Sequence, residues 1–344
     1  MRKCRLISGA IILVLVTGYA VYWHQVARIF DQNLAAWPEQ WRAQGYQINV
    51  GRSEIHGFPW LLRSAIDQFE MRSPPGPQSW ALSKQHGAVT LTGEPWRPLG
   101  FGIELSREQS WLMTDGAGRD VLRLHSNWGN GDVKLGFDGR LKLIWLQGQL
   151  AVESPALPSI QIKEMRGRLA LDDENLKDEQ AADINAMLSL TDVDIDLPQE
   201  SPLGNHVSKL IAAGFVIGGI PPGSPRESLS RWRDNGGVAE VTRLEINWGP
   251  LAVTADATIA LDQQLQPLIA GTATVRGYNQ AIDALLAGDL ISQAQGTTAR
   301  VALAAIAQTD DDGNKVKLPI TVQDGFLFLG PLKVAAVPRI AWPQ

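Results

Sequence analysis

Cysteine is almost absent from this chain of 344 residues, in which Cys4 is the only thiol. The rest of the chain therefore cannot form an internal disulfide or hold a thiolate metal or redox centre. Positive charge is not in excess either, because 31 Lys and Arg residues stand against 36 Asp and Glu residues, for a net charge of −5. Without a basic surface to attract phosphate groups, nucleic acid is excluded as an expected partner.

Signatures of catalysis and of cofactor binding are also absent. The sequence contains no P-loop, no G-x-G-x-x-G after a strand, no G-x-S-x-G and no H-E-x-x-H. Asp192, Asp194 and Asp196 resemble the start of a calcium loop, but Leu197 and Leu203 stand where Gly and Glu are required. We therefore expect no catalytic residues, no metal and no cofactor.

An apolar segment is present at the N-terminus. Three basic residues precede the uncharged residues 6–21, and Tyr22 and Trp23 follow, an order typical of a transmembrane helix with its N-terminus in the cytoplasm. A helix of this length covers about 24 Å of a hydrocarbon core of about 30 Å, so Tyr22 and Trp23 must reach the far interface. We expect residues 1–23 to be a membrane anchor. A cleaved signal peptide is the alternative, because Gly18 and Ala20 fit a small-x-small site.

Residues 24–45 predict an amphipathic helix that stops at Gly45. Pro38 should kink or restart this helix, because proline removes one amide donor. In one interpretation the helix lies beside the membrane with its aromatic face in the lipid surface, and in the other its apolar stripe packs on the following domain. The membrane-interface residues of the first interpretation are Tyr22, Trp23, Phe30, Trp37 and Trp41.

Beyond residue 45 the apolar period changes from helical to two. In residues 251–262 the odd positions are apolar, while Thr254, Asp256 and Thr258 face the other way. Residues 133–137, 141–143, 165–171, 193–197, 243–248 and 326–332 alternate in the same way, and Asp138-Gly139 and Asp324-Gly325 are hairpin turn signals.

The predicted fold is α+β and mainly β. An N-terminal transmembrane helix is followed by a long, curved antiparallel meander, with a few C-terminal helices packed on one face. Helices are expected at residues 202–215, 226–235, 280–290 and 293–308. We expect residues 46–220 to form an antiparallel β region, and residues 221–344 a β region with interspersed helices that continues the same sheet.

The apolar side of these strands is the candidate binding surface for a hydrophobic ligand. The segment Gly57-Phe58-Pro59-Trp60 cannot be an ordinary central strand, so it is a structural corner or an aromatic gate for such a ligand. Trp248 is also explained as an ordinary core residue. The candidate ligand-binding residues are Phe58, Trp60, Leu244, Ile246, Trp248, Leu251, Val253 and Ile259.

Several short segments together resemble a known family. They are the helix that ends at Gly45, the segment Ser53-Glu54-Ile55-His56-Gly57-Phe58-Pro59-Trp60, Trp248-Gly249-Pro250-Leu251, Val275-Arg276-Gly277 and Leu329-Gly330-Pro331. The chain thereby resembles the domain-of-unknown-function family 2125 of bacterial envelope proteins. More distantly, it is similar to the AsmA-like group of anchored, β-rich periplasmic proteins associated with lipid traffic. The resemblance supplies no catalytic residues.

Together with the basic residues before the apolar segment, the resemblance implies a single-pass protein of the bacterial inner membrane, with the N-terminus in the cytoplasm and the bulk of the chain in the periplasm. We expect a protein that is not an enzyme and that binds or passes lipid, or another hydrophobic ligand, in an apolar groove. Its partners would be membrane lipid and an envelope protein. A non-catalytic envelope scaffold with a closed core is the alternative, and an envelope hydrolase with dispersed catalytic residues is the second alternative.

Overall fold

The computed structural model describes residues 2–76, 79–136, 141–171, 182–219, 225–304, 307–310, 313–330, 332–340 and 342. The Asp138-Gly139 turn and the boundary expected after residue 220 fall outside these ranges. The chain forms two compact units, one of Met1–Leu141 with Ser154–Ala156 and the other of Lys142–Glu153 with Leu157–Gln344. Each unit is described by itself.

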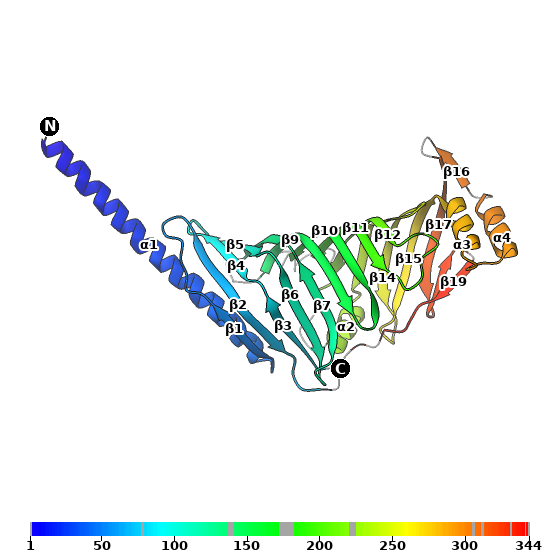
Figure 1. The fold of residues 1–344 in the computed structure, drawn as a ribbon, viewed down its shortest axis with the longest axis horizontal. Coiled ribbons are helices and arrows are strands. Elements are labelled where there is room, and N and C mark those ends of the chain that lie inside the picture. Colours follow the sequence, from blue (N-terminus) through cyan, green and yellow to red (C-terminus); the bar gives the residue numbers. More distant parts are fainter. Residues whose placement is uncertain are drawn as a thin grey trace. The chain divides into compact units, whose positions relative to one another are not determined.

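The chain is mainly β, as predicted. A long N-terminal helix leads into an antiparallel meander, and within the described residues three shorter helices interrupt the nineteen strands (Figure 1). Among the described residues, no helix has a stretch that is both long enough and apolar enough to cross a membrane.

The N-terminal helix α1 runs without interruption over Arg2–Arg42, with Pro38 inside it. Pro38 therefore does not restart the helix, contrary to one of the predicted outcomes. The residue lies in the last two turns, so only four residues of the helix follow it, and its ring is buried. The expected division between residues 23 and 24 does not break the helix either.

In the first unit, six consecutive strands combine in pairs into three long, interrupted strands: β3 with β4, β5 with β6, and β7 with β8. They follow one another beside β2 (Leu62–Arg72). On one edge β2 pairs with β1, and on the other it pairs with β4 near its start and with β3 near its end. The next pairings are β4 with β5 and β3 with β6, followed by β5 with β8 and β6 with β7. The strands are β1 (Gln47–Arg52), β2 (Leu62–Arg72), β3 (Trp80–His86), β4 (Val89–Glu94), β5 (Arg97–Leu105), β6 (Gln109–Asp115), β7 (Asp120–Ser126) and β8 (Gly129–Leu135).

Each of these strands is interrupted at the same level, between β3 and β4, between β5 and β6, and between β7 and β8. We call this line of interruptions the crease. Gly87, between β3 and β4, has a φ of 84°. Gln109, at the start of β6, is only 1% exposed, and its Nε2 donates hydrogen bonds to Ala88 O at 2.8 Å and to Ser106 Oγ at 2.7 Å. The crease is therefore fixed by a buried amide that lies against a glycine.

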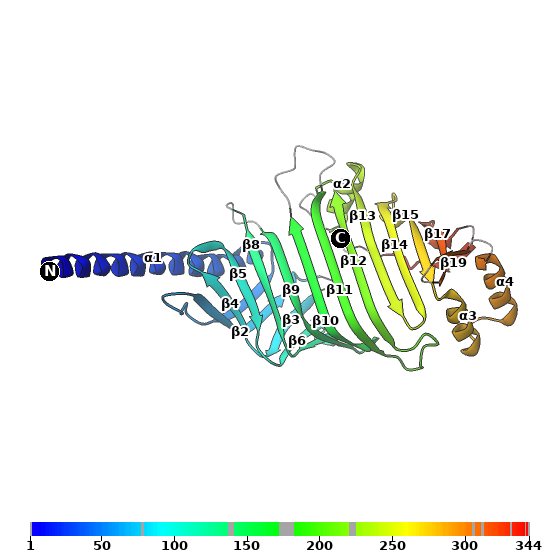
Figure 2. The ribbon, with the colours of Figure 1, turned by 90° about the horizontal axis from the view of Figure 1, so that it is seen from above.

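The second unit is a simple meander. From β10 to β15 each strand pairs with the next, and β15 then pairs with β17. Figure 2 shows β10 to β15 side by side. The elements are β9 (Leu141–Ser154), β10 (Leu157–Leu171), β11 (Ala182–Asp196), β12 (His206–Ile217), α2 (Pro225–Asp234), β13 (Val238–Trp248), β14 (Leu251–Leu261), β15 (Pro267–Arg276), α3 (Tyr278–Ala287), α4 (Gln293–Ala304), β16 (Ala307–Asp310), β17 (Gly313–Gln323), β18 (Phe326–Leu329) and β19 (Leu332–Ala336).

Most elements predicted for the second unit are confirmed. The alternating residues 251–262 form β14, and the helices predicted at 226–235 and 280–290 are α2 and α3. Asp324-Gly325 joins β17 to β18 with φ angles of 53° and 75°, as a two-residue hairpin turn requires.

Two helix predictions need correction. Residues 202–215 were expected to be helical, but His206–Ile217 is strand β12, which pairs with β11 on one side and β13 on the other. This stretch is apolar on both sides, and such a run does not distinguish a strand from a buried helix by its period. The helix predicted at 293–308 ends at Ala304, and residues 307–310 form β16 instead.

We expect Gly87→Ala to lower the free energy of unfolding by about 2–4 kcal/mol. A methyl group would add left-handed backbone strain of about 1–2 kcal/mol, and it would overlap the amide of Gln109, which cannot move away without leaving its buried hydrogen bonds. Gly118→Ala is the matched control, because its φ is 77° and no atom lies within 4 Å of the added methyl group. Urea unfolding of both variants measures the difference. Equal losses would show that Gln109 does not hold the crease.

Candidate functional site

One face of the second sheet is apolar across seven strands. The cross-strand pairings connect residues of β10, β11, β12, β13, β14, β15 and β17 into rows, and paired residues point to the same side of a sheet. Four alternate rows contain only apolar residues and glycine, and together they define the apolar face. The rows are Met165, Leu190, Leu210, Ile246, Val253, Val275 and Val316; Gly167, Leu188, Ala212, Leu244, Ala255, Ala273 and Leu318; Leu169, Ala186, Gly214, Val241, Ala257, Gly271 and Ile320; and Leu171, Ile184, Val216, Ala239, Ile259, Ile269 and Val322.

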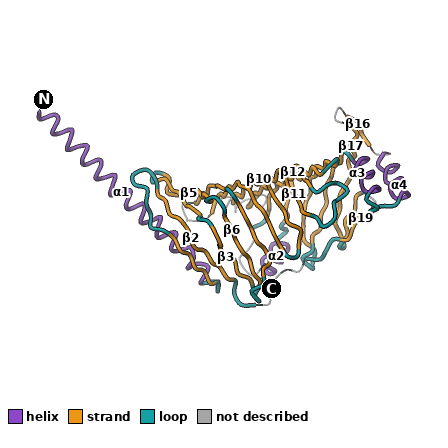
Figure 3. The backbone as a smooth tube through the Cα atoms, viewed as in Figure 1, coloured by secondary structure: helices purple, strands orange, loops and turns teal. Residues whose placement is uncertain are grey.

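The edges of the apolar face are packed by the protein itself. Tyr278 and Ile282 of α3 form a buried cluster with Val316 and Leu318 of β17. Further along the strands, Met165, Leu190 and Ile246 of the first row pack against a buried cluster of Ile162, Val193 and Val207. Figure 3 shows α3 and α4 beside β17 rather than over β10 to β13.

Among the described residues, the centre of the apolar face is only partly covered. On β10 to β14, every residue of the second, third and fourth rows is half-buried or exposed, and Leu188 is 38% exposed. Seven strands at about 4.8 Å and four rows at about 6.7 Å give the whole face dimensions of roughly 29 by 20 Å. This is an extended hydrophobic surface of the kind that marks interaction sites.

Six of the eight predicted ligand-binding residues lie on this side of β13 and β14. Leu244, Ile246, Val253 and Ile259 are members of the apolar rows, and Trp248 pairs with Leu251 at the end of the same hairpin. Trp248 packs against the Ile162 cluster, and its Nε1 donates to Gly204 O at 2.7 Å. Its surroundings are therefore those of a core residue.

Phe58 and Trp60 are in the first unit, where their loop lies against α1. The Phe58 ring meets Trp23 edge-on at 5.4 Å and stacks on His24 at 6.2 Å. Phe58 is 51% exposed and Trp60 is 67% exposed. The Phe58 ring contacts the helix, and the backbone on both sides of Trp60 accepts hydrogen bonds from it, so this loop is a feature separate from the six residues of the second unit.

The apolar stripe of α1 packs on its own unit, as the second interpretation of that helix predicted. Trp23 is 4% exposed and forms a buried cluster with Ala27 and Leu62. The side chain of Trp23 therefore contacts protein, which corrects its assignment to the lipid surface.

The other four residues assigned to the membrane interface also contact the protein. The Phe30 ring lies 6.3 Å from Phe101, Trp37 stacks at 6.3 Å on Phe69, and Trp41 meets Tyr46 edge-on at 5.1 Å. Tyr22 remains 45% exposed while its hydroxyl donates to Pro95 O at 2.8 Å.

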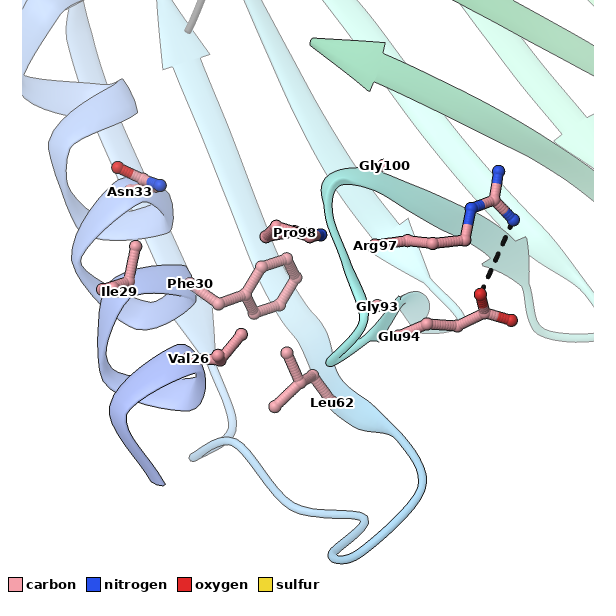
Figure 4. Close-up of a pocket in the computed structure, with 10 residues that line it drawn as sticks. All are labelled: Val26, Ile29, Phe30, Asn33, Leu62, Gly93, Glu94, Arg97, Pro98 and Gly100. Atoms are coloured by element: carbon pink, nitrogen blue, oxygen red, sulfur yellow. Dashed lines mark ion pairs between the residues drawn. The ribbon is translucent and has the colours of Figure 1, made fainter. Parts of the chain in front are cut away.

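A small cavity lies between α1 and the first sheet. Val26 and Phe30 from the helix face Leu62, and Arg97 and Glu94 lie beyond them (Figure 4). The cavity has a volume of about 20 Å³, which is room for a single water molecule. It is too small to be a ligand site.

The opposite face of the second sheet is charged. Glu245 of β13 lies between Lys209 Nζ at 2.9 Å and Arg243 at 2.5 Å. The hydrogen bonds from Lys209 and then from Arg243 hold the pKa of Glu245 below its usual range. The two faces of the sheet therefore differ sharply in polarity.

The aspartates that resemble a calcium loop are engaged by neighbouring side chains. Asp194 Oδ1 lies 2.7 Å from His206 Nδ1, and Asp192 Oδ2 lies 3.2 Å from Lys163 Nζ. Within the described ranges, no three His, Cys, Asp or Glu side chains are grouped so that they could hold a metal ion.

Sequence reasoning missed the β11 part of the apolar face. Ile184, Ala186, Leu188 and Leu190 alternate strictly, a signal that was available in the sequence. The pattern then changes phase before Val193, because Asp192 adopts a φ of 51°. A search for strict alternation over the whole of residues 184–197 therefore does not find this strand.

The family model of DUF2125, described as an uncharacterized protein conserved in bacteria, matches residues 23–338. The chain belongs to the DUF2125 family. The match includes the packed part of α1, the crease and the whole apolar face. No curated protein and no solved structure matches this DUF2125 protein.

We expect Glu245→Gln to lower the free energy of unfolding by roughly 0.5–1 kcal/mol at pH 7, since the partners of Glu245 are partly exposed. A lowered pKa in the folded state stabilises the fold above the unfolded pKa of about 4.3. That stabilisation is lost as the pH falls through the lower, folded value. Urea unfolding of both proteins at pH 7 and at pH 3 measures the effect, and a difference that persists unchanged at pH 3 would contradict it.

Proposed function

We propose that this DUF2125 protein is a membrane-anchored, non-enzymatic protein of the bacterial envelope that holds lipid acyl chains on its apolar face. The observation that carries the proposal is the set of four apolar rows, whose centre on β10 to β14 is half-buried or exposed. A face of this size exposed to water is costly unless a hydrophobic ligand covers it.

The chemistry of the face favours an acyl chain over a polar ligand. Its rows contain no hydrogen-bonding or charged side chain, so recognition rests on area and shape alone. Each buried methylene contributes about 0.8 kcal/mol. Ten methylenes along a row would therefore supply up to about 8 kcal/mol before the losses of entropy on binding.

The anchor in this proposal is the N-terminal part of α1. Residues 11–16 are six consecutive apolar side chains, each between 55% and 70% exposed, and in the sequence they continue an uncharged stretch that begins at Leu6. Such a stretch is stable in a hydrocarbon environment and unfavourable in water. The basic residues before it keep the N-terminus in the cytoplasm, and the rest of the chain then lies in the periplasm.

We expect Leu188→Glu to reduce the lipid that co-purifies with the full chain at least tenfold. A carboxylate on the apolar face must lose its hydration against an acyl chain, at a cost of several kcal/mol, and tenfold corresponds to only about 1.4 kcal/mol. Native mass spectrometry of protein extracted in mild detergent measures bound lipid. Met187→Glu is the matched control, because Met187 is the adjacent residue, is 45% exposed and lies on the opposite face, paired with Arg168.

A photo-crosslinking amino acid at the same two positions decides between lipid and protein as the occupant. Lipid adducts at position 188 and not at position 187 are the expected result in bacterial membranes. Adducts of a protein partner at position 188 without lipid would overturn lipid binding and identify the face as a protein interface. Absence of any adduct at position 188 would also overturn lipid binding, and it is the result that a scaffold with a closed core predicts.

The proposed topology places Cys4 in the cytoplasm. A membrane-impermeant maleimide should therefore leave Cys4 unlabelled in intact spheroplasts and label it after lysis. The control is a variant with Cys4→Ser and Ala156→Cys, since Ala156 is exposed in the turn between β9 and β10 and a cysteine there should be labelled without lysis. Labelling of Cys4 in intact spheroplasts would overturn the orientation.

A further inference from the structure

Four exposed aromatic residues of the first unit lie on α1 or in two loops that are hydrogen-bonded to it. Tyr22, Phe58, Trp60 and Trp96 are 45%, 51%, 67% and 54% exposed, respectively. We call them the aromatic collar. Large aromatic side chains with this much exposure are unusual on a surface that meets only water.

The collar is attached to α1 by three hydrogen bonds. Tyr19 donates from its hydroxyl to Pro59 O at 2.6 Å, in the loop that carries Phe58 and Trp60. The Tyr22 hydroxyl donates to Pro95 O at 2.8 Å, in the turn between β4 and β5. Trp23 Nε1 donates to Leu61 O at 3.3 Å. Two separate loops are thus tied to the same five residues of the helix.

The ties make the collar a fixed surface. Pro95, directly before Trp96, is almost fully buried, and so is Leu62 after the other loop. The Phe58 ring contacts both Trp23 and His24. Trp60 and Trp96 therefore project from anchored backbone, and their exposure is a property of the fold.

The collar lies where the exposed apolar stretch of α1 ends. Val16 is 57% exposed, and Tyr19 follows it by three residues, which is about 4.5 Å along a helix. If residues 11–16 lie in hydrocarbon, a group one turn further along the helix lies at the level of the lipid headgroups. Tyr and Trp concentrate at that level, because each has an apolar ring and a polar group.

We propose that the aromatic collar docks the first unit onto the periplasmic surface of the membrane, with Phe58, Trp60 and Trp96 among the lipid headgroups. The inference rests on the proposed anchor and goes beyond it. A simple tether leaves the exported unit free to tilt, whereas contacts from two additional loops fix how it stands on the bilayer. The partner is the lipid surface, since the loops of the collar are hydrogen-bonded to Tyr19 and Tyr22, within two turns of the exposed apolar residues 11–16.

The test uses the full chain with Cys4→Ser in vesicles of phosphatidylethanolamine and phosphatidylglycerol. A nitroxide label is placed by cysteine substitution at Val14, at Trp60, at Trp96 or at Ala117. Ala117 is the control, because it is exposed in the turn between β6 and β7, at the end of the interrupted strands opposite to Trp96. The accessibility of each label to oxygen and to a water-soluble nickel chelate reports its depth.

The expected result is a label in hydrocarbon at position 14, labels at headgroup depth at positions 60 and 96, and a label in water at position 117. In a second outcome, position 14 lies in hydrocarbon, but the labels at 60 and 96 are as accessible to the nickel chelate as the label at 117. That result would overturn the docking of the collar and leave the anchor intact. A label in water at position 14 would overturn the anchor and the collar together.

Discussion

The cross-strand register of the second unit is the constraint on which its apolar face depends. Side chains alternate with a period of two, so a slip of one residue in any strand would turn its polar residues onto that face. The register is kept in phase by local irregularities. Asp192 has a φ of 51°, and β12 and β13 have irregular pairings after Val207 and after Val241. Each irregularity shifts the alternation of its strand by one residue, so that apolar side chains continue to point to the apolar face.

The two units bury their sheets in different ways. In the first unit, α1 lies along the sheet, with Trp23, Ala27 and Leu62 in its core, while the crease at Gln109 lets the long strands bend. In the second unit, α3 packs mainly against β17 and the neighbouring Val275 of β15, and the face of β10 to β14 stays half-buried or exposed. The incomplete cover in the second unit is what leaves apolar side chains of these strands accessible.

The helix α1 combines two surfaces along one continuous element. Residues 11–16 are exposed around the helix, whereas the part from Trp23 onward presents a stripe to the protein. The aromatic collar stands between these parts. A single rigid helix therefore transmits the position of its apolar end to the folded unit, which a flexible linker could not do.

The sequence by itself determined the periodic elements of this protein. The alternation of residues 251–262, the helix that became α3 and the Asp324-Gly325 turn are local signals, since each depends on residues close together in the chain. It also supplied the apolar residues of β13 and β14, including Leu244, Ile246, Val253 and Ile259. Local signals failed at residues 202–215, where apolar residues on both sides concealed a strand.

Only the tertiary structure decided which apolar residues share one face and which are covered. The rows join residues as distant as Gly167 and Leu318, and the place of Phe58 beside Trp23 depends on the packing of α1. Pairing and packing are contacts between distant segments, so the period of any one segment cannot specify them.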